Sequence, residues 1–175
     1  PSRKRWSPLI DNIGHVPMTK PTIFIDADAC PVKAEAEQII TRHQLSLVIV
    51  SNGGIRPSPN PLVQLVIVDE GPDVADKYIA DTAKAGDIVV TGDIPLAARV
   101  IGNNVTAIRH NGDVFTTDNI GGQLATRDLM ADLRAADPFL VQSNRKGGAA
   151  AFSDKDRSRF RNSLEAAIQR SKKGD

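Results

Sequence analysis

The chain has 175 residues, enough for one domain with its own hydrophobic core, and 41% of them are hydrophobic, as is usual for a globular protein. No stretch approaches the roughly 18 apolar residues that a membrane span requires, and no segment has the pattern of a secretory signal, so we expect no membrane association. A single cysteine, Cys30, excludes an internal disulfide and indicates a reducing cytoplasm.

The net charge of +1 conceals an uneven distribution of charge along the chain. Residues 21–140 contain 9 Lys and Arg against 16 Asp and Glu, whereas residues 141–175 contain 9 against 4. Residues 1–20 are also basic and show no apolar periodicity, so we interpret them as a flexible extension before one domain over residues 21–172. An acidic body with basic ends fits a cation-binding centre flanked by phosphate-binding arms, and it also fits ends that merely keep the protein soluble.

Short apolar runs alternate with helical patterns along most of the chain. The runs predict strands at residues 22–25, 45–50, 65–68, 87–91 and 105–108. The intervening segments predict helices at residues 31–43, 73–86 and 93–101. This alternation predicts an α/β fold, a three-layer α/β/α sandwich with a mainly parallel sheet, and leaves antiparallel pairing open at residues 105–116.

Two further helices are predicted after the last strand. The first is capped by Thr117 or Asp118 and extends to about Ala136, and a Gly- and Ala-rich linker then leads to a helix capped by Ser153. Helical periodicity predicts two buried stripes, made of Leu124, Leu129, Met130 and Leu133 in the first helix and of Phe160, Leu164 and Ile168 in the second.

Two carboxylates lie at the end of the first predicted strand. Asp26 and Asp28 directly follow an apolar run, and because side chains alternate along a strand, both can face the same side. In open α/β sheets, ligands bind outside the carboxyl ends of the strands. A carboxylate at the end of a buried strand is costly unless it is paired or bound to a metal. The pair therefore indicates a site for a divalent cation.

Aspartates recur at the equivalent place after later strands. Asp73 and Asp76 begin the helix after the third strand, and Asp93 follows the fourth. If the strands are neighbours, Asp26, Asp28, either Asp73 or Asp76, and Asp93 would surround one pocket suited to Mg²⁺ or Mn²⁺. Asp73 and Asp93 also stand where aspartate commonly caps a helix, which needs no metal, and both interpretations stay open for Asp93. Asp76, one turn into its helix, is better placed than Asp73 to face the pocket.

Other residue types offer weaker candidates. Cys30 precedes a helix, whose N-terminus would favour a reactive thiolate, although a structural cysteine is the more common case. Four cations are candidates for contacting a substrate phosphate, and the alternative for each is a solvated or ion-paired side chain. They are Lys33, Arg56, Arg99 and Arg127.

Four motifs in order resemble the YaiI/YqxD family of bacterial proteins. They are residues 26–33 (DADACPVK), 71–76 (GPDVAD), 91–99 (TGDIPLAAR) and 127–130 (RDLM), and residues 152–157 (FSDKDR) add a further match. The resemblance extends from about Thr22 through the last helix, and residues 1–20 lie outside it. Members of this family are similar in fold to PIN-domain nucleases and have no established function.

The resemblance implies a PIN-like α/β/α domain in which acidic residues ligate Mg²⁺ or Mn²⁺ for RNA cleavage. On that pattern Asp26, Asp28, Asp76 and Asp93 would be the metal ligands and catalytic residues, and Thr91 would be a supporting hydroxyl. We therefore expect a metal-dependent ribonuclease.

Two alternatives remain. One is a non-catalytic RNA-binding protein whose acidic pocket is vestigial, with the basic ends providing most of the affinity. The other is a phosphatase similar to the haloacid dehalogenases, in which Asp26 is the nucleophile, although the second acid expected beside Asp93 is missing. The oligomeric state does not follow from the sequence.

Overall fold

A computed structural model of the chain describes residues 20–27, 31–137, 139 and 151–173. Its strands are β1 (Thr22–Asp26), β2 (Ser46–Ser51), β3 (Val63–Ile67), β4 (Ile88–Val90), β5 (Thr106–Ile108) and β6 (Val114–Phe115). Its helices are α1 (Lys33–His43), α2 (Val74–Thr82), α3 (Ile94–Ile101), α4 (Thr117–Ala136) and α6 (Asp154–Lys173).

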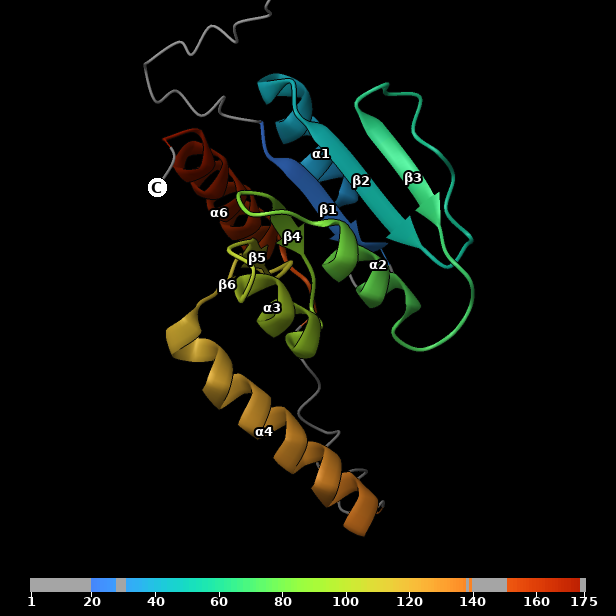
Figure 1. The fold of residues 1–175 in the computed structure, drawn as a ribbon, viewed down its shortest axis with the longest axis vertical. Helices are drawn as coiled ribbons and strands as arrows, with labels where there is room; N and C mark the ends of the chain where they lie inside the picture. The colour runs from blue at the N-terminus through green and yellow to red at the C-terminus, as the bar shows by residue number, and fades with distance from the viewer. Residues whose placement is uncertain (1–19, 28–30, 138, 140–150, 174–175) are drawn as a thin grey trace, which may run out of the picture.

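The six strands form one sheet in the order β3-β2-β1-β4-β5-β6 (Figure 1). All neighbours are parallel except β5 and β6, which are antiparallel. Strands β2 and β3 lie on one side of β1, and β4 lies on its other side. The change of direction between β1 and β4 is a topological switch point, where open α/β sheets bind their ligands.

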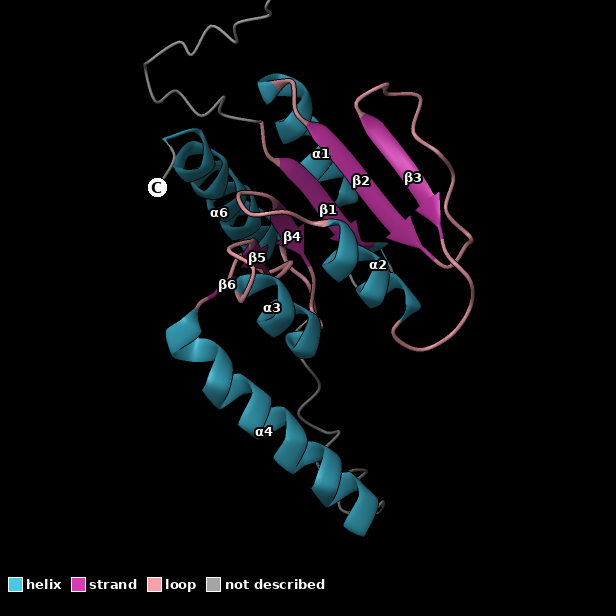
Figure 2. Ribbon diagram, viewed as in Figure 1, coloured by secondary structure: helices cyan, strands magenta, loops and turns pink. Residues whose placement is uncertain are grey.

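Alternating side chains of the central strands enter two separate cores. Ile23 and Ile25 of β1 belong to the core covered by α1 and α6, whereas Phe24 belongs to the core covered by α2 and α3. Both faces of β1, β2 and β4 are therefore buried, which explains why these strands are continuous apolar runs in the sequence. Figure 2 shows the resulting layers, with helices on both sides of the sheet. The predicted three-layer α/β/α sandwich is confirmed.

The predicted strands and first three helices all occur, with ends that differ by a few residues. The third strand begins at Val63 rather than Leu65, and α2 ends at Thr82, four residues before Gly86. The short strand β6 was not predicted separately, but its antiparallel pairing with β5 falls in the region where that arrangement was left open. The turn between them contains Gly112 (φ 92°), where an added Cβ would lie 2.6 Å from the backbone of Arg159 in α6.

Helix α4 differs most from the prediction. Its cap is Thr116, whose side chain and that of Asn119 form a reciprocal capping box, rather than Thr117 or Asp118. Its predicted inner stripe is wrong, because Leu129, Met130 and Leu133 are 46–56% exposed and the helix has no buried residue. The physical reason is visible in Figure 1, where α4 starts beside β6 and then extends away from the sheet.

Helix α6, in contrast, packs as its periodicity predicts. Phe160, Leu164 and Ile168 are completely buried in the core shared with α1. Ser153 caps the helix as predicted, since its hydroxyl accepts a hydrogen bond from the Asp156 backbone N–H at 3.3 Å.

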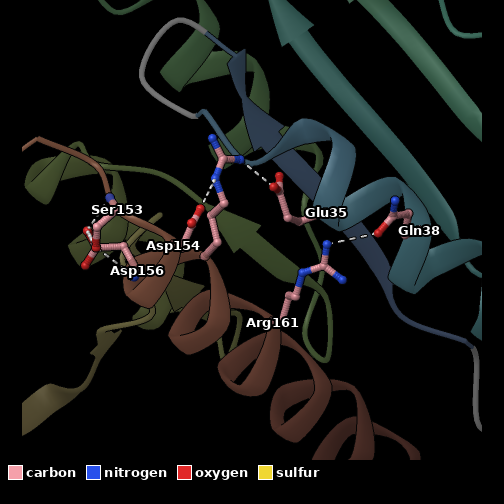
Figure 3. A network of polar contacts seen from close by, with 7 residues as sticks. Glu35, Gln38, Ser153, Asp154, Asp156 and Arg161 are labelled. Carbon is pink, nitrogen blue, oxygen red and sulfur yellow. Dashed lines mark hydrogen bonds and ion pairs between the residues drawn. The ribbon is translucent and has the colours of Figure 1, made fainter.

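A polar network joins α6 to α1 (Figure 3). Arg157 Nη1 donates to Glu35 Oε1 at 2.5 Å, and Glu35 is only 5% exposed. Farther along the same two helices, Arg161 donates to Gln38 at 3.0 Å. The carboxyl-terminal helix is therefore held to the fold by a buried ion pair as well as by apolar contacts. None of the helices in the described part of the chain has the length and apolarity needed to cross a membrane.

Candidate active site

A small acidic cavity lies at the carboxyl edge of the sheet, at the switch point between β1 and β4. Its volume is about 210 Å³. It is lined by Asp26, Asn52, Asp69, Gly71, Asp73, Ala75, Asp76 and Asp93. These residues come from the ends of β1, β2 and β3 and from the starts of α2 and α3, so the strand topology gathers groups that are far apart in sequence. The lining contains five aspartates and, among the described residues, no Lys or Arg.

Asp26 is the buried member of this group. It is the last residue of β1, pairs in register with Val50 of β2, and is 7% exposed. The hydroxyl of Thr91, which follows β4 and is fully buried, donates to Asp26 Oδ2 at 3.4 Å. The same hydroxyl accepts the backbone N–H of Asp93 at 3.0 Å. Thr91 thus connects the carboxylate at the end of β1 to the start of α3.

Asp93 performs the capping role that the sequence allowed and also faces the cavity. Its Oδ1 accepts the backbone N–H of Leu96 at 2.9 Å, which makes it the N-cap of α3, and Pro95 occupies the first turn. A carboxylate has two oxygens with about four acceptor positions, so this hydrogen bond leaves acceptor capacity for another partner. The two interpretations left open for Asp93 are therefore compatible.

Asp76 is the cavity residue whose pKa departs clearly from its ordinary value. Burial is the largest cause that raises its pKa, to about 7, followed by the negative charges of Asp93 and Asp26. A hydrogen bond with the side chain of Asp93 and the charge of Asp73 act in the same direction. The raised pKa favours the protonated form of Asp76 among these neighbouring carboxylates.

Asp73 lies at the N-cap position of α2 but does not cap it. Its side chain makes no capping hydrogen bond, and its backbone is left-handed, with φ at 65°. Aspartate tolerates this conformation better than most residues, although it still costs of order 1 kcal/mol. The capping role favoured for Asp73 in the sequence is therefore wrong, and its side chain lines the cavity instead.

Asn52 and Asp69 were missed as site residues. Asn52 directly follows β2, and Asp69 follows β3 by two residues. Both are exposed and lie in segments rich in turn-forming residues, where polar side chains are expected without any function. The available signal was their position after neighbouring parallel strands, which is the same signal that identified Asp26 and Asp93.

The other predicted site residues lie away from the acidic cavity or outside the described part of the chain. Asp28 and Cys30 lie outside the described residues. Lys33 begins α1, Arg56 lies in the segment before β3, and Arg99 is exposed on α3 at 4.0 Å from Asp81. Lys33, Arg56 and Arg99 do not line the acidic cavity, and Arg127 lines a second cavity.

The chemistry of the acidic cavity suits a hard cation. It offers carboxylate oxygens and one amide and contains no sulfur or imidazole among its described lining residues, the donor set that Mg²⁺ and Mn²⁺ prefer. Burial raises the pKa of Asp76 most, and the charges of Asp93 and Asp26 raise it further, so a cation beside it would offset both effects. Among the described residues, no three acidic, histidine or cysteine side chains yet converge on one point as metal ligands do, so binding would require these side chains to rotate inward.

Comparison with known proteins places this geometry in a family. Residues 24–170 match the model of a family described as "Uncharacterized BCR, YaiI/YqxD family". The chain belongs to the YaiI/YqxD family. Among its relatives are UPF0178 proteins of Roseobacter denitrificans and Ruegeria pomeroyi, which are 58% and 57% identical to it over 148 residues. These alignments cover 85% of this chain and 95% and 94% of the two relatives, respectively.

A more distant relative is the UPF0178 protein of Parvibaculum lavamentivorans, 53% identical over 147 residues, which are 84% of this chain and 93% of the relative. The resemblance to the YaiI/YqxD family inferred from the motifs is thereby confirmed. No solved structure matches the chain, so similarity to PIN domains stays a prediction.

Proposed function

We propose that this YaiI/YqxD-family protein is a nuclease that uses Mg²⁺ or Mn²⁺ to hydrolyse RNA phosphodiester bonds in the cytoplasm. The observation that carries the proposal is the acidic cavity at the switch point, where Asp26, Asp76 and Asp93 from three different elements line one space of about 210 Å³. Helix capping does not explain why the three are gathered, since Asp93 is the one of them that caps a helix.

Each of these three side chains would have a different role in binding a cation. Asp26 is buried, and the hydroxyl of Thr91 orients it, so its carboxylate is the most fixed of the group. Asp93 is fixed through its cap, whereas Asp76 is half-buried and, because its pKa is raised to about 7, is the ligand that would lose a proton when a cation binds. By the motif pattern, Asp28 would complete the ligand set. The bound ion would supply a Lewis acid for the charge that develops on the phosphoryl oxygens and would orient the attacking water.

The structure weighs against the phosphatase alternative. That chemistry needs a lysine beside the nucleophilic aspartate, for which Lys77 and Lys84 are the nearest candidates in the sequence. Lys77 is exposed on α2, Lys84 lines a different cavity beside β1, and neither lines the acidic cavity. The non-catalytic RNA-binding alternative differs from the nuclease in one measurable respect, cleavage.

The test is cleavage of an end-labelled single-stranded RNA by the purified protein with Mn²⁺ or Mg²⁺. Asp76→Asn is the informative variant because it removes a charge and keeps the size of the side chain. We expect it to lower the cleavage rate by at least about 100-fold, the usual scale for losing one charge-stabilising group. Asp81→Asn is the matched control, since Asp81 lies on the same helix but outside the cavity.

Three results bear on the proposal. EDTA should abolish cleavage by the wild type, and Asp81→Asn should cleave normally. Cleavage that persists in EDTA, or that is equal in the Asp76→Asn variant, would contradict the proposal. RNA binding without any cleavage would favour the non-catalytic alternative.

A further inference from the structure

A second cavity of about 530 Å³ is lined by residues of α4, the start of α3 and the segment after β5. Residues that line it include Arg109 after β5, Arg127 and Arg134 on α4, and Ile94 at the start of α3. Ile94 is the residue directly after Asp93, which lines the acidic cavity, so the start of α3 contributes one residue to each cavity. We call the second cavity the arginine groove.

The arginine groove has a charge opposite to that of the acidic cavity. Its described lining residues include three arginines and no Asp or Glu. Arg127 and Arg134 are seven residues apart, two helical turns, so they lie on one face of α4. The acidic residues of α4 that lie nearest in sequence, Asp128 and Asp132, do not line the groove, although Asp128 Oδ1 lies 3.5 Å from Arg127 Nη1 in an exposed ion pair.

The guanidinium of Arg109 is held in place by neutral partners. Its Nη2 donates to Gln123 Oε1 on α4 at 3.1 Å, and its Cζ lies 5.0 Å from the centre of the Phe115 ring. Neither contact neutralises its charge. A fixed and uncompensated guanidinium loses little conformational entropy on binding an anion, which favours recognition of a phosphate.

Apolar side chains accompany the arginines. Ile94 and Met130 line the groove, and Met130 is 50% exposed. Cations bind the backbone of any nucleic acid, whereas apolar side chains contact sugars and bases. In an RNA duplex the bases are stacked inside the helix, and only an unpaired strand exposes their faces to such a surface.

From this juxtaposition we propose that the arginine groove binds the phosphate backbone of single-stranded RNA and leads the strand into the acidic cavity. The inference rests on the proposed nuclease function and deepens it by naming the form of the substrate and the residues that hold it. Arg127 and Arg134 contact successive phosphates from α4, and Arg109 contacts the strand nearer the acidic cavity. The exposure of Met130, one of the residues predicted to be buried, is then explained by contact with the bound strand.

The test measures binding separately from cleavage. Fluorescence anisotropy with a labelled single-stranded RNA decamer in EDTA reports the affinity of the 175-residue protein while no metal is available for hydrolysis. Arg127→Gln and Arg134→Gln should each raise Kd about five- to tenfold and flatten the slope of log Kd against log salt by about 0.7, as expected for one lost phosphate contact. Arg42→Gln, which alters an exposed arginine near the end of α1 that lines neither cavity, makes the same charge change elsewhere and should leave Kd unchanged.

A duplex RNA of the same sequence should bind at least about tenfold more weakly than the single strand, because its bases are not available to Ile94 and Met130. Equal affinity of the Arg127→Gln, Arg134→Gln and wild-type proteins for the decamer would overturn the inference, as would equal affinity for the duplex. Light scattering that shows a wild-type dimer and a monomer for either α4 variant would overturn it too, since the groove would then be an interface between copies.

Failure of this inference is distinguishable from failure of the proposed function. Arginine-dependent binding without cleavage would support the groove and contradict the nuclease. Metal-dependent cleavage that is lost in Asp76→Asn, with RNA affinity unchanged in both α4 variants, would support the nuclease and overturn the groove.

Discussion

The side chains of Asp76 and Asp93 line one small cavity although they belong to the starts of two different helices. Their helices follow β3 and β4, which are separated in the sheet by β2 and β1. Two like-charged groups in contact destabilise one another unless a proton or a cation lies between them. The fold therefore holds two carboxylates close together at a cost in folding free energy, and a bound cation would offset that cost.

The role of Asp93 as a cap can be separated from its role toward a cation. Asp93→Asn retains an oxygen that accepts the Leu96 N–H, so we expect its thermal stability to equal or exceed that of the wild type. Asp93→Ala loses the cap and should be about 1 kcal/mol less stable. Both variants should bind Mn²⁺ more than about tenfold more weakly by calorimetry, since even indirect partners of a metal matter on that scale. Unchanged Mn²⁺ affinity in Asp93→Asn would show that Asp93 is only a cap.

The hydroxyl of Thr91 is expected to matter for both stability and metal binding. Thr91→Val preserves shape but leaves the buried N–H of Asp93 without its acceptor, a loss of about 1–3 kcal/mol of unfolding free energy. It also releases the Asp26 carboxylate that the hydroxyl orients, so Mn²⁺ affinity should fall. Thr91→Ser keeps the hydroxyl and should keep the affinity. Urea unfolding and calorimetry check both effects, and a valine variant indistinguishable from the serine variant would be contrary to this expectation.

The acidic cavity should make the metal-free protein less stable as pH rises toward neutrality. Burial and the neighbouring Asp93 and Asp26 raise the pKa of Asp76 from 3.8 to about 7. Between about pH 4 and pH 7 the folded protein keeps a proton that the unfolded chain has lost, so the free energy of unfolding decreases as pH rises through that interval. Unfolding in EDTA at several pH values should show this decrease, and Asp76→Asn should remove most of it. An equal pH dependence in the variant would assign the effect to other groups.

The ion pair between α1 and α6 should contribute to stability without affecting the acidic cavity. Arg157→Ala leaves the buried carboxylate of Glu35 without its cation, and because the guanidinium itself is 41% exposed we expect a loss of about 2–3 kcal/mol, below the range for fully buried pairs. Arg161→Ala, which removes only the exposed hydrogen bond to Gln38, is the control and should cost under about 0.5 kcal/mol. Equal effects of the two substitutions would show that burial of Glu35 does not matter.

The elements of this fold were largely predictable because burial on both faces makes β1, β2 and β4 continuous apolar runs. Asp26 and Asp93 were predictable for the same reason, since a charged residue directly after such a run is conspicuous. The order of the strands was not readable from the chain, and only that order shows that the ends of β1 and β4 are neighbours. Asn52 and Asp69 therefore looked like ordinary loop residues.

Helix α4 is an element for which the predicted burial was wrong. Its apolar residues recur at helical spacing, and that pattern alone predicts a buried stripe. Periodicity reports that one face of a helix is apolar, but it does not report whether the rest of the chain covers that face. Met130 and Leu133 are half exposed. Arg109 and Arg127 line the same groove, although no pattern in the sequence associates the segment after β5 with α4.

The most direct measurement of the central claim is the position of Mn²⁺ in crystals of the protein grown with that ion, located by its anomalous scattering. We expect a peak at the switch point of the sheet, coordinated by Asp26, Asp76 and Asp93. Crystals saturated with Mn²⁺ that show no peak in the acidic cavity, with Asp76 and Asp93 still hydrogen-bonded to each other, would contradict the account.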